Sequence, residues 1–334
     1  MVTSVLHESG FTALEKLTEN RKACILTDEN VFRLYGDKFP GLPRMVLKPG
    51  EKSKTMENVM KLIRHCDKNG LDRSSLIIGI GGGVVTDMAG FTAGIYLRGI
   101  PCGYVPTTLL AQVDAAAGGK TAVNFNGAKN HIGLFRKPEF IIYLPHVLAT
   151  LSKKELLSGY GEILKHALIS GENFFTLFEK DSPGYPVNTE FIERSRKLKN
   201  TVVAEDFHEN SSRKKLNLGH TMGHVFELLC ENLTHGEAVA LGILFSVRFS
   251  EIRYGKESSL SKKVRSILIR YGFDYKIPRL PYENVRELLF QDKKRKNSHI
   301  SFVFVDTPGK IFCENISVDE IVSVYKKLCG KEGK

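Results

Sequence analysis

Two histidines, His220 and His224, stand four residues apart in the stretch LNLGHTMGHVFE. If this stretch is helical, the spacing puts both imidazoles on one face of the helix. His235 follows in LTHGEAVALG, and Glu162 stands four residues before His166 in GYGEILKHAL. A catalytic zinc commonly takes three ligands from His, Glu and Asp and keeps one position open for water or substrate. The residue types therefore predict a divalent-metal site of two histidines and one glutamate, while their spacing leaves open which residues bind.

A glycine-rich segment, SLIIGIGGGVVTDMAGF, begins at Ser75 as a buried strand and continues into the start of a helix near Val84. Between them stand Gly79, Gly81, Gly82 and Gly83. Backbone N–H groups at such a helix start can bind a phosphate. The glycines do not fit the GxGxxG fingerprint, because Val84 stands at its sixth position. We therefore expect a different turn that binds phosphate or pyrophosphate. Asp28, at the end of an earlier strand, either accepts hydrogen bonds from ribose hydroxyls or forms an ordinary strand-end turn.

The segment DAAAGGKT (114–121) almost matches the nucleoside-triphosphate loop GxxxxGK[ST], but Asp114 replaces its first glycine. A carboxylate there would repel a triphosphate, and the tight turn would lose its glycine. We therefore do not expect a triphosphatase. Lys120, Lys129 and Asn130 nevertheless stand close to Asp114 among small or apolar residues. The two lysines are either ligands for phosphate or carboxylate groups or ordinary surface residues.

The pattern of predicted helices and strands that must hold these residues changes near residue 150. Before it, runs rich in Ile, Val and Leu alternate with amphipathic stretches, which predicts a helix at 57–70 and strands at 23–28, 43–49, 75–83, 102–106 and 139–145. After it, we expect a strand at 299–306 and helices at 151–170, 191–207, 221–233 and 236–252. Alternating strands and helices favour a mainly parallel sheet covered on both faces. The sequence thus predicts an α/β domain over residues 1–150 and a mostly helical domain over residues 151–334.

The chain has 334 residues, of which 42% are hydrophobic, and a formal charge of +11. This charge suits a small anionic substrate. We expect no nucleic-acid binding, because the basic run KKRK (293–296) has no interleaved aromatic residues and no known nucleic-acid motif. We expect no membrane attachment, because the longest uncharged run (99–113) is too short to span a bilayer. The six cysteines form no CxxC pair and the N-terminus lacks a signal peptide, so a cytoplasmic protein without a disulfide framework is expected.

These motifs occur together in one known family. From about Asp28 to about Val305 the chain resembles the 3-dehydroquinate synthases, through GGGVVTDMAGF, YLRG, VPTTLLAQVDAAAGGKTAVN, GAKN, GEILKHALI, LNLGHTMGH and HGEAVALG. The resemblance implies a Rossmann-like, nucleotide-binding α/β domain followed by a helical domain, in a homodimer. It also implies conversion of 3-deoxy-D-arabino-heptulosonate 7-phosphate to 3-dehydroquinate and phosphate, with NAD and zinc or cobalt as cofactors. The alternatives are another sugar-phosphate cyclase and a metal-dependent NAD alcohol or glycerol dehydrogenase.

The resemblance also assigns residues, motif by motif. It places the metal on Glu162, His220 and His235. It places NAD on Asp28, Asn30, Gly50, Glu51, Lys54, Gly82, Gly83, Val84, Val85, Asp87, Thr107, Thr108, Lys120, Lys129 and Thr150. It places the substrate on Asp114, Lys120, Asn130, Lys165, Lys199, Arg213, Asn217, His224 and either Lys293 or Lys294. Arg98 of YLRG would reach the substrate phosphate across the dimer interface, and His224 and Glu209 would handle protons.

The two histidines of LNLGHTMGHVFE are separated by this assignment. His220 would bind the metal, whereas His224, one turn later, would contact the substrate. Asn217, one turn earlier on the same helix face, would also contact the substrate. One position departs from the family pattern, because Thr86 stands where the family usually has glycine.

Overall fold

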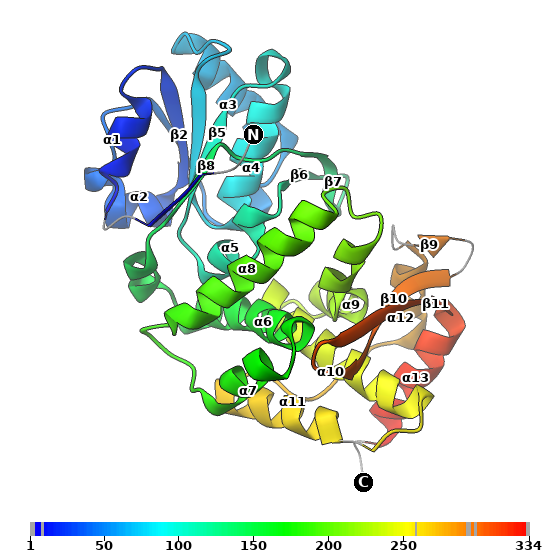
Figure 1. Ribbon diagram of the computed structural model, residues 1–334. Coiled ribbons are helices and arrows are strands. Elements are labelled where there is room, and N and C mark those ends of the chain that lie inside the picture. Colours follow the sequence, from blue (N-terminus) through cyan, green and yellow to red (C-terminus); the bar gives the residue numbers. More distant parts are fainter. Residues whose placement is uncertain (1–3, 8–9, 258, 292–294, 297–298, 332–334) are drawn as a thin grey trace. The chain divides into compact units, whose positions relative to one another are not determined.

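The computed structural model describes residues 4–7, 10–257, 259–291, 295–296 and 299–331. The chain divides into two compact units, residues 1–151 and 152–334. The first unit is a sheet with helices on both faces, and the second is mostly helical with one small sheet (Figure 1). Each unit has hydrophobic core clusters of its own residues.

The first unit is built on a parallel sheet whose six described strands lie in the order β1-β8-β5-β4-β2-β3. The strands are β1 (Ser4–His7), β2 (Ala23–Asp28), β3 (Arg44–Leu47), β4 (Leu76–Gly81), β5 (Cys102–Pro106) and β8 (Phe140–Tyr143). Strands covered on both faces need apolar side chains in both directions, which explains the uninterrupted apolar runs. In β4, Ile77 packs into one core and Ile78 and Ile80 pack into the other, as the alternation of a strand requires.

Helices cover both faces of this sheet. α3 (Met56–Lys68) and α4 (Gly83–Ile95) contribute to the core on one face, and α1 (Ala13–Thr18) and α2 (Glu29–Tyr35) contribute to the core on the other. The shorter helical segments are α5 (Leu109–Val113), η1 (Gly36–Lys38), η2 (Glu51–Ser53), η3 (Tyr96–Arg98), η4 (Ala115–Ala117) and η5 (Pro145–Thr150). Outside the sheet, an antiparallel hairpin is formed by β6 (Lys120–Phe125) and β7 (Ala128–Phe135).

The second unit consists mainly of helices. They are α6 (Lys153–Ser170), α7 (Glu172–Lys180), α8 (Thr189–Glu205), η6 (Ser212–Asn217), α9 (His220–Leu229), α10 (His235–Arg253), α11 (Ser259–Tyr271), α12 (Tyr282–Gln291) and α13 (Val318–Lys331). The long helix α10 packs against α6, α9, α11 and strand β10. Because neighbours surround it, α10 carries apolar residues on all sides instead of along one stripe.

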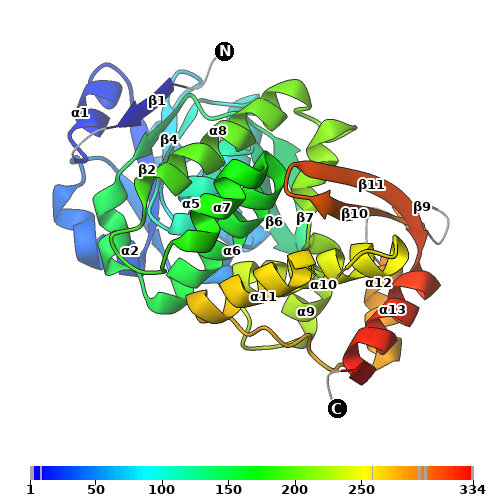
Figure 2. The same ribbon diagram turned by 60° about the horizontal axis from the view of Figure 1, so that its bottom comes forward.

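A small antiparallel sheet completes the second unit, with its described strands in the order β11-β10-β9. The strands are β9 (Arg295–Lys296), β10 (His299–Thr307) and β11 (Lys310–Ser317). Figure 2 shows β10 and β11 side by side as a long hairpin. Phe302 and Phe304 of β10 pack with Phe245 and Phe249 of α10 in one aromatic cluster.

The predicted fold class is confirmed. All five strands expected before residue 150 form within a residue or two of their predicted bounds, and the late strand is β10. Strands β1, β6, β7, β9 and β11 were not predicted. β6, β7 and β11 expose alternate or successive side chains, so they lack the apolar runs by which the buried strands were found. Within the described residues, no helix combines the length and the apolar character that crossing a membrane requires.

Candidate functional site

Three side chains from three helices of the second unit converge. Glu162 lies inside α6, and His220 and His235 are the first residues of α9 and α10. Glu162 Oε1 lies 3.6 Å from His220 Nε2 and 3.3 Å from His235 Nε2. Two ligands of a tetrahedral zinc, each about 2.1 Å from the ion, lie about 3.4 Å apart. The donor types and their separations therefore fit one divalent transition-metal ion such as zinc.

Glycines allow these helices to approach closely. A Cβ atom at Gly236 would lie 1.8 Å from the carbonyl oxygen of Ser158, so α10 contacts α6 backbone to backbone. A Cβ atom at Gly242 would lie 1.9 Å from the carbonyl oxygen of Gly219, which directly precedes α9. Any larger residue at either position would require the main chain to move. Two of the glycines that flank the histidines in the sequence, Gly219 and Gly236, therefore help to bring the three helices together.

The surroundings of His220 keep its ring neutral. Burial, and then the positive charge of Lys165, lower the pKa of His220 well below its usual range. Its Nδ1 lies 3.2 Å from the carbonyl oxygen of Leu218. A carbonyl can only accept, so Nδ1 carries the proton and Nε2 keeps the lone pair. Because Nε2 is the atom that faces Glu162, His220 is prepared to act as a metal ligand.

Glu162 is fully buried and has charged neighbours on both oxygens. Its Oε1 faces the two histidines, and its Oε2 pairs with the ammonium of Lys165, one turn later on α6. A buried carboxylate stays ionised only with such partners. On the opposite side, His235 Nδ1 lies 3.1 Å from Glu227 Oε2. Burial by itself would lower the pKa of His235, but the hydrogen bonds and charges of Glu162 and Glu227 raise it to about 10.

Helix α9, which carries His220 and His224, does not extend back to Asn217. α9 starts at His220 and is preceded by Gly219, whose φ is +80°. Asn217 is the last residue of the separate turn η6. The prediction that Asn217 shares a helix face with His220 and His224 is therefore wrong, because the left-handed backbone at Gly219 cannot continue a helix. Asn217 Nδ2 instead donates to Glu209 Oε1 at 2.5 Å. His224 lies one turn beyond His220, with ring centroids 5.4 Å apart.

Asp206 organises the loop that carries Glu209, and sequence reasoning missed it because a lone aspartate carries no motif. Its carboxylate accepts the backbone N–H groups of Asn210, Ser211 and Arg213 at 2.8, 2.7 and 3.1 Å. Burial would raise the pKa of Asp206, but these hydrogen bonds lower it to about 2. Glu209 has a φ of +60° in this loop, a conformation that costs energy and is common at functional sites.

Three cationic side chains of the second unit are buried: Lys165 on α6, Lys199 on α8 and Arg213 in η6. α6 packs against α8, and η6 contacts both helices. Lys165 pairs with Glu162, and the Arg213 guanidinium donates to the Phe207 carbonyl at 2.7 Å. Three cations on adjoining elements suit a ligand that carries phosphate or carboxylate groups.

In the first unit, predicted nucleotide residues gather at the carboxyl ends of neighbouring parallel strands. β3 and β4 lie on opposite sides of β2, so the direction of strand order reverses there. In open parallel sheets such a reversal forms a crevice where ligands bind. Asp28 ends β2, and its Oδ1 accepts the N–H groups of Asn30 and Val31 at 2.9 and 3.1 Å. Asp28 therefore caps α2 at the edge of the crevice.

The glycine-rich turn is shorter than its sequence indicates. A Cβ atom at Gly81 would lie 2.6 Å from Val85, so this glycine serves the packing of β4 on α4. Gly82 and Gly83 alone stand at the start of α4, where backbone N–H groups can meet a phosphate. The Thr86 hydroxyl donates to the Gly83 carbonyl at 3.1 Å. Thr86 is thus accommodated within the first turn of α4 and leaves the helix start in place.

Lys54 is the centre of a polar network in the first unit. Its ammonium lies 2.6 Å from Asp87 Oδ2 and 2.5 Å from Asn130 Oδ1, and the side chain is almost fully buried. Asn124, which sequence reasoning missed, donates to Glu51 Oε1 and accepts the N–H of Asn130, both at 2.8 Å. Asn130 has a φ of +51°, which this hydrogen bond helps to hold. The network joins residues predicted for NAD with one predicted for the substrate.

Most of the remaining predicted residues lie on other elements of the first unit. The Thr107 N–H donates to the Gly81 carbonyl at 2.9 Å, which ties the end of β5 to the end of β4. Arg98 is exposed in η3 with a φ of +65°. The other first-unit positions are Gly50 before η2, Val84 and Val85 in α4, Thr108 at the cap of α5, Asp114 after α5, Lys120 in β6, Lys129 in β7 and Thr150 in η5. Lys293 and Lys294 lie outside the described residues.

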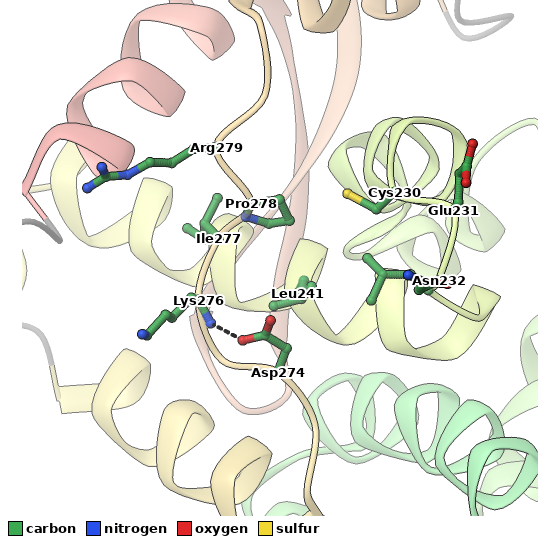
Figure 3. Close-up of a pocket in the computed structure, with 10 residues that line it drawn as sticks. Cys230, Glu231, Asn232, Leu241, Asp274, Lys276, Ile277, Pro278 and Arg279 are labelled. Atoms are coloured by element: carbon green, nitrogen blue, oxygen red, sulfur yellow. Dashed lines mark hydrogen bonds between the residues drawn. The ribbon is translucent and has the colours of Figure 1, made fainter.

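A cavity of about 670 Å³ lies elsewhere in the second unit (Figure 3). It is lined by Cys230, Glu231, Asn232, Leu233, Leu241, Asp274, Lys276, Ile277, Pro278 and Arg279. The backbone N–H of Lys276 donates to Asp274 at 2.9 Å. The cavity contains none of the predicted site residues.

Comparison with known sequences identifies relatives of the whole chain. Residues 44–158 match the family described as 3-dehydroquinate synthase N-terminal, and residues 159–295 match the 3-dehydroquinate synthase C-terminal family. The 3-dehydroquinate synthase of Alkaliphilus metalliredigens is 38% identical over 303 residues, covering 87% of this chain and 85% of that protein. That of Pyrococcus abyssi is 37% identical over 328 residues, covering 97% of this chain and 96% of that protein.

Solved structures show the same fold. A 2-epi-5-epi-valiolone synthase from Streptomyces hygroscopicus subsp. jinggangensis, with NAD⁺ and Zn²⁺ bound, superposes with a TM-score of 0.88 at 25% identity, covering 99% of this chain and 98% of that one. A 2-deoxy-scyllo-inosose synthase, complexed with carbaglucose-6-phosphate, NAD⁺ and Co²⁺, gives 0.85 at 24% identity, covering 97% and 96%. Glycerol dehydrogenase from Schizosaccharomyces pombe is more distant, with a TM-score of 0.63 at 17% identity over 98% and 90%.

Proposed function

This chain belongs to the 3-dehydroquinate synthase family, and from that premise we propose that it converts 3-deoxy-D-arabino-heptulosonate 7-phosphate to 3-dehydroquinate and phosphate. The observation that carries the proposal is the convergence of Glu162, His220 and His235, whose donor atoms lie within 4.8 Å of one another. This set suits a catalytic metal, because three protein ligands leave a position for substrate oxygen.

The proposed metal is zinc or cobalt, held by Glu162 Oε1, His220 Nε2 and His235 Nε2. When bound, it supplies Lewis-acid stabilisation to substrate hydroxyl groups. The protein's part is to direct both Nε2 atoms at one point, and His235 would lose its Nε2 proton as the metal binds. The Leu218 carbonyl orients the ring of His220, and the closely packed helices fix the main chain around all three ligands.

The proposed NAD site lies at the carboxyl ends of β2, β4 and β5. When bound, NAD supplies a reversible hydride acceptor for the substrate carbon. Gly82 and Gly83 at the start of α4 suit the pyrophosphate, and Asp28 at the end of β2 suits the ribose hydroxyls. Lys54 and Asp87 neutralise each other and give the crevice a fixed polar wall. Thr107, Thr108, Lys120, Lys129 and Thr150 complete the proposed site.

The proposed substrate contacts include the buried cationic side chains of the second unit. Lys165, Lys199 and Arg213 are buried cations that suit the carboxylate and phosphate of the heptulosonate phosphate. Asn217 donates to Glu209, which holds that carboxylate in one direction for proton transfer. His224, exposed one turn beyond His220, offers an imidazole nitrogen as the second proton carrier. Asp114, Lys120 and Asn130 are the proposed contacts from the first unit.

We also propose a homodimer, in which Arg98 reaches the substrate phosphate from the neighbouring subunit. Arg98 is exposed, and its φ of +65° is a backbone conformation that is common at functional sites, which supports this role. Mixed dimers of Arg98→Ala with His220→Ala chains test this arrangement. Each mixed dimer should contain one complete site and therefore have about half the activity of the wild-type dimer. Mixed dimers that stay inactive would contradict a shared site.

The reaction is tested with the heptulosonate phosphate, zinc and a trace of NAD⁺. We expect many equivalents of phosphate per NAD⁺, one equivalent of 3-dehydroquinate per phosphate and no net NADH. NADH appearing in step with substrate would indicate a dehydrogenase instead. Phosphate release from another sugar phosphate only, with the heptulosonate phosphate left intact, would indicate a different cyclase. Neither product, with metal and NAD bound, would overturn the proposal.

A further inference from the structure

The imidazole of His235 lies between two carboxylates. Its Nε2 is 3.3 Å from Glu162 Oε1, and its Nδ1 is 3.1 Å from Glu227 Oε2. The Glu227 side chain is only 12% exposed, so its carboxylate is partly shielded from water. Neither the comparison of motifs nor the metal-ligand set assigns Glu227 a role.

Helix α9 presents Glu227 and the ligand His220 on the same side. The two residues are separated by two helical turns, with His224 between them, so all three side chains lie along one face. Helix α9 therefore carries one proposed metal ligand, His220, and contacts a second, His235, through the side chain of Glu227.

The main chain of His235 is fixed, but its ring needs a further restraint. Thr234 and Glu237 form a capping box at the start of α10, with the Thr234 N–H donating to Glu237 Oε2 at 2.8 Å. Gly236 packs directly on α6. These contacts hold the backbone on both sides of His235, while rotation about its two side-chain bonds would still turn the ring. The hydrogen bond to Glu227 opposes that rotation.

Two possible metal groups share His235, and the proton on its ring distinguishes them. One group is Glu162, His220 and His235, and the other is His224, Glu227 and His235. An imidazole that binds a metal does so through the one nitrogen that has given up its proton. With Nδ1–H donating to Glu227, that nitrogen is Nε2, which faces Glu162. Such carboxylate–histidine pairs orient the ligands of many zinc sites.

We propose that Glu227 is a positioning residue for the metal, which holds His235 so that Nε2 points to the ion shared with Glu162 and His220. The inference rests on the proposed function, because that function requires a metal at these ligands. Glu227 would touch neither the metal nor the substrate.

The test measures metal affinity in the full chain after removal of metal and reloading with Zn²⁺ or Co²⁺. Glu227→Ala should weaken Zn²⁺ binding about 10- to 100-fold in equilibrium dialysis, and should change the visible spectrum of bound Co²⁺. Glu227→Gln should weaken binding less, because its amide oxygen still accepts the Nδ1–H bond. Glu231→Gln is the matched control, since it removes the same charge from an exposed residue four positions later and should bind as the wild type does.

The outcomes separate this inference from the proposed function. A wild-type protein that turns over without metal would overturn both the metal role and this inference. A metal-dependent wild type, with Glu227→Ala unchanged in affinity and Co²⁺ spectrum, would overturn the inference alone. Equal losses for Glu227→Ala, Glu227→Gln and His224→Ala would show that Glu227 and His224 are ligands, which also overturns it. If Glu227→Ala does not fold, Glu227→Gln decides by the same two readouts.

Discussion

The carbonyl oxygen of Ser158 on α6 lies so close to the α-carbon of Gly236 on α10 that a Cβ atom there would be 1.8 Å away. This contact sets the distance between Glu162, one turn after Ser158, and His235, which precedes Gly236. The two strongest ligand candidates are thus placed by a residue without a side chain.

Gly236→Ala should therefore damage both stability and metal binding. The clash is with main-chain oxygen, which cannot rotate away, so we expect a loss of about 1–3 kcal/mol or more in the free energy of unfolding. Urea unfolding of the metal-free protein measures this loss, and zinc dialysis should show weaker binding. Gly330→Ala in α13 is the control, because a Cβ atom there meets nothing within 4 Å. An unchanged Gly236→Ala variant would contradict the packing described above.

Asp206 predicts a pH dependence of stability. Its pKa is about 2 in the folded protein and 3.8 in an ordinary aspartate, so the folded state holds the ionised form more strongly. The resulting stabilisation is complete when the pH is above the pKa of Asp206 in the unfolded chain, and it is lost as the pH falls from about 4 toward 2. Asp206→Asn removes the charge at every pH. The difference in urea midpoint between wild type and variant should be constant near neutral pH and should shrink below pH 4, whereas a constant difference down to pH 2 would exclude this origin.

The same variant has a functional expectation. Because Asp206 holds the loop that carries Glu209 and Arg213, Asp206→Asn should raise the KM for the heptulosonate phosphate while NAD and zinc affinities stay unchanged. A loss of zinc affinity would mean that the variant disturbs the helices and not only the loop.

Much of the fold was predictable because burial leaves a pattern. The apolar runs of β2 and β4 are needed on both faces of a parallel sheet, and both strands form where expected. The hairpin β6–β7 was missed because β6 buries only alternate side chains and β7 buries none, so neither strand has an apolar run. Asn217 was wrongly placed on the helix of His220 and His224. The positive φ of Gly219, which packs against α10, separates the two segments, and residue spacing does not record that contact.

The candidate site, like the fold, was predictable only in part. Residue types and spacing pointed to a metal site, but His224 and His235 were equivalent on those grounds. Glu162 lies near His235 because of the packing of α6 on α10, which a sequence read along the chain does not contain. Asp206, Asn124 and Glu227 were missed for a related reason, since each acts through a neighbour that is distant in sequence or lacks a motif.

Asn124 offers a test of the network around Lys54. Asn124→Ala removes the donor to Glu51 and the acceptor of the Asn130 N–H, two hydrogen bonds worth together about 1–3 kcal/mol. We expect NAD or substrate affinity to fall by about tenfold, as measured by calorimetry and by KM. Asn315→Ala on β11, an exposed asparagine, should have no effect. Wild-type affinities in Asn124→Ala would show that Glu51 and Asn130 keep their positions without it.

His220 and His224 lie on one helix face but should fail in different ways. His220→Ala removes a proposed ligand, so we expect zinc affinity and turnover to be lost together, with far-UV circular dichroism unchanged. His224→Ala should keep zinc affinity near the wild-type value and lower kcat by about 10²–10⁴-fold, the usual contribution of a proton carrier. The two variants are matched in chemistry and lie one turn apart, so general damage to α9 would affect both alike. The reverse result, with zinc lost in His224→Ala and kept in His220→Ala, would move the metal to the group that contains Glu227.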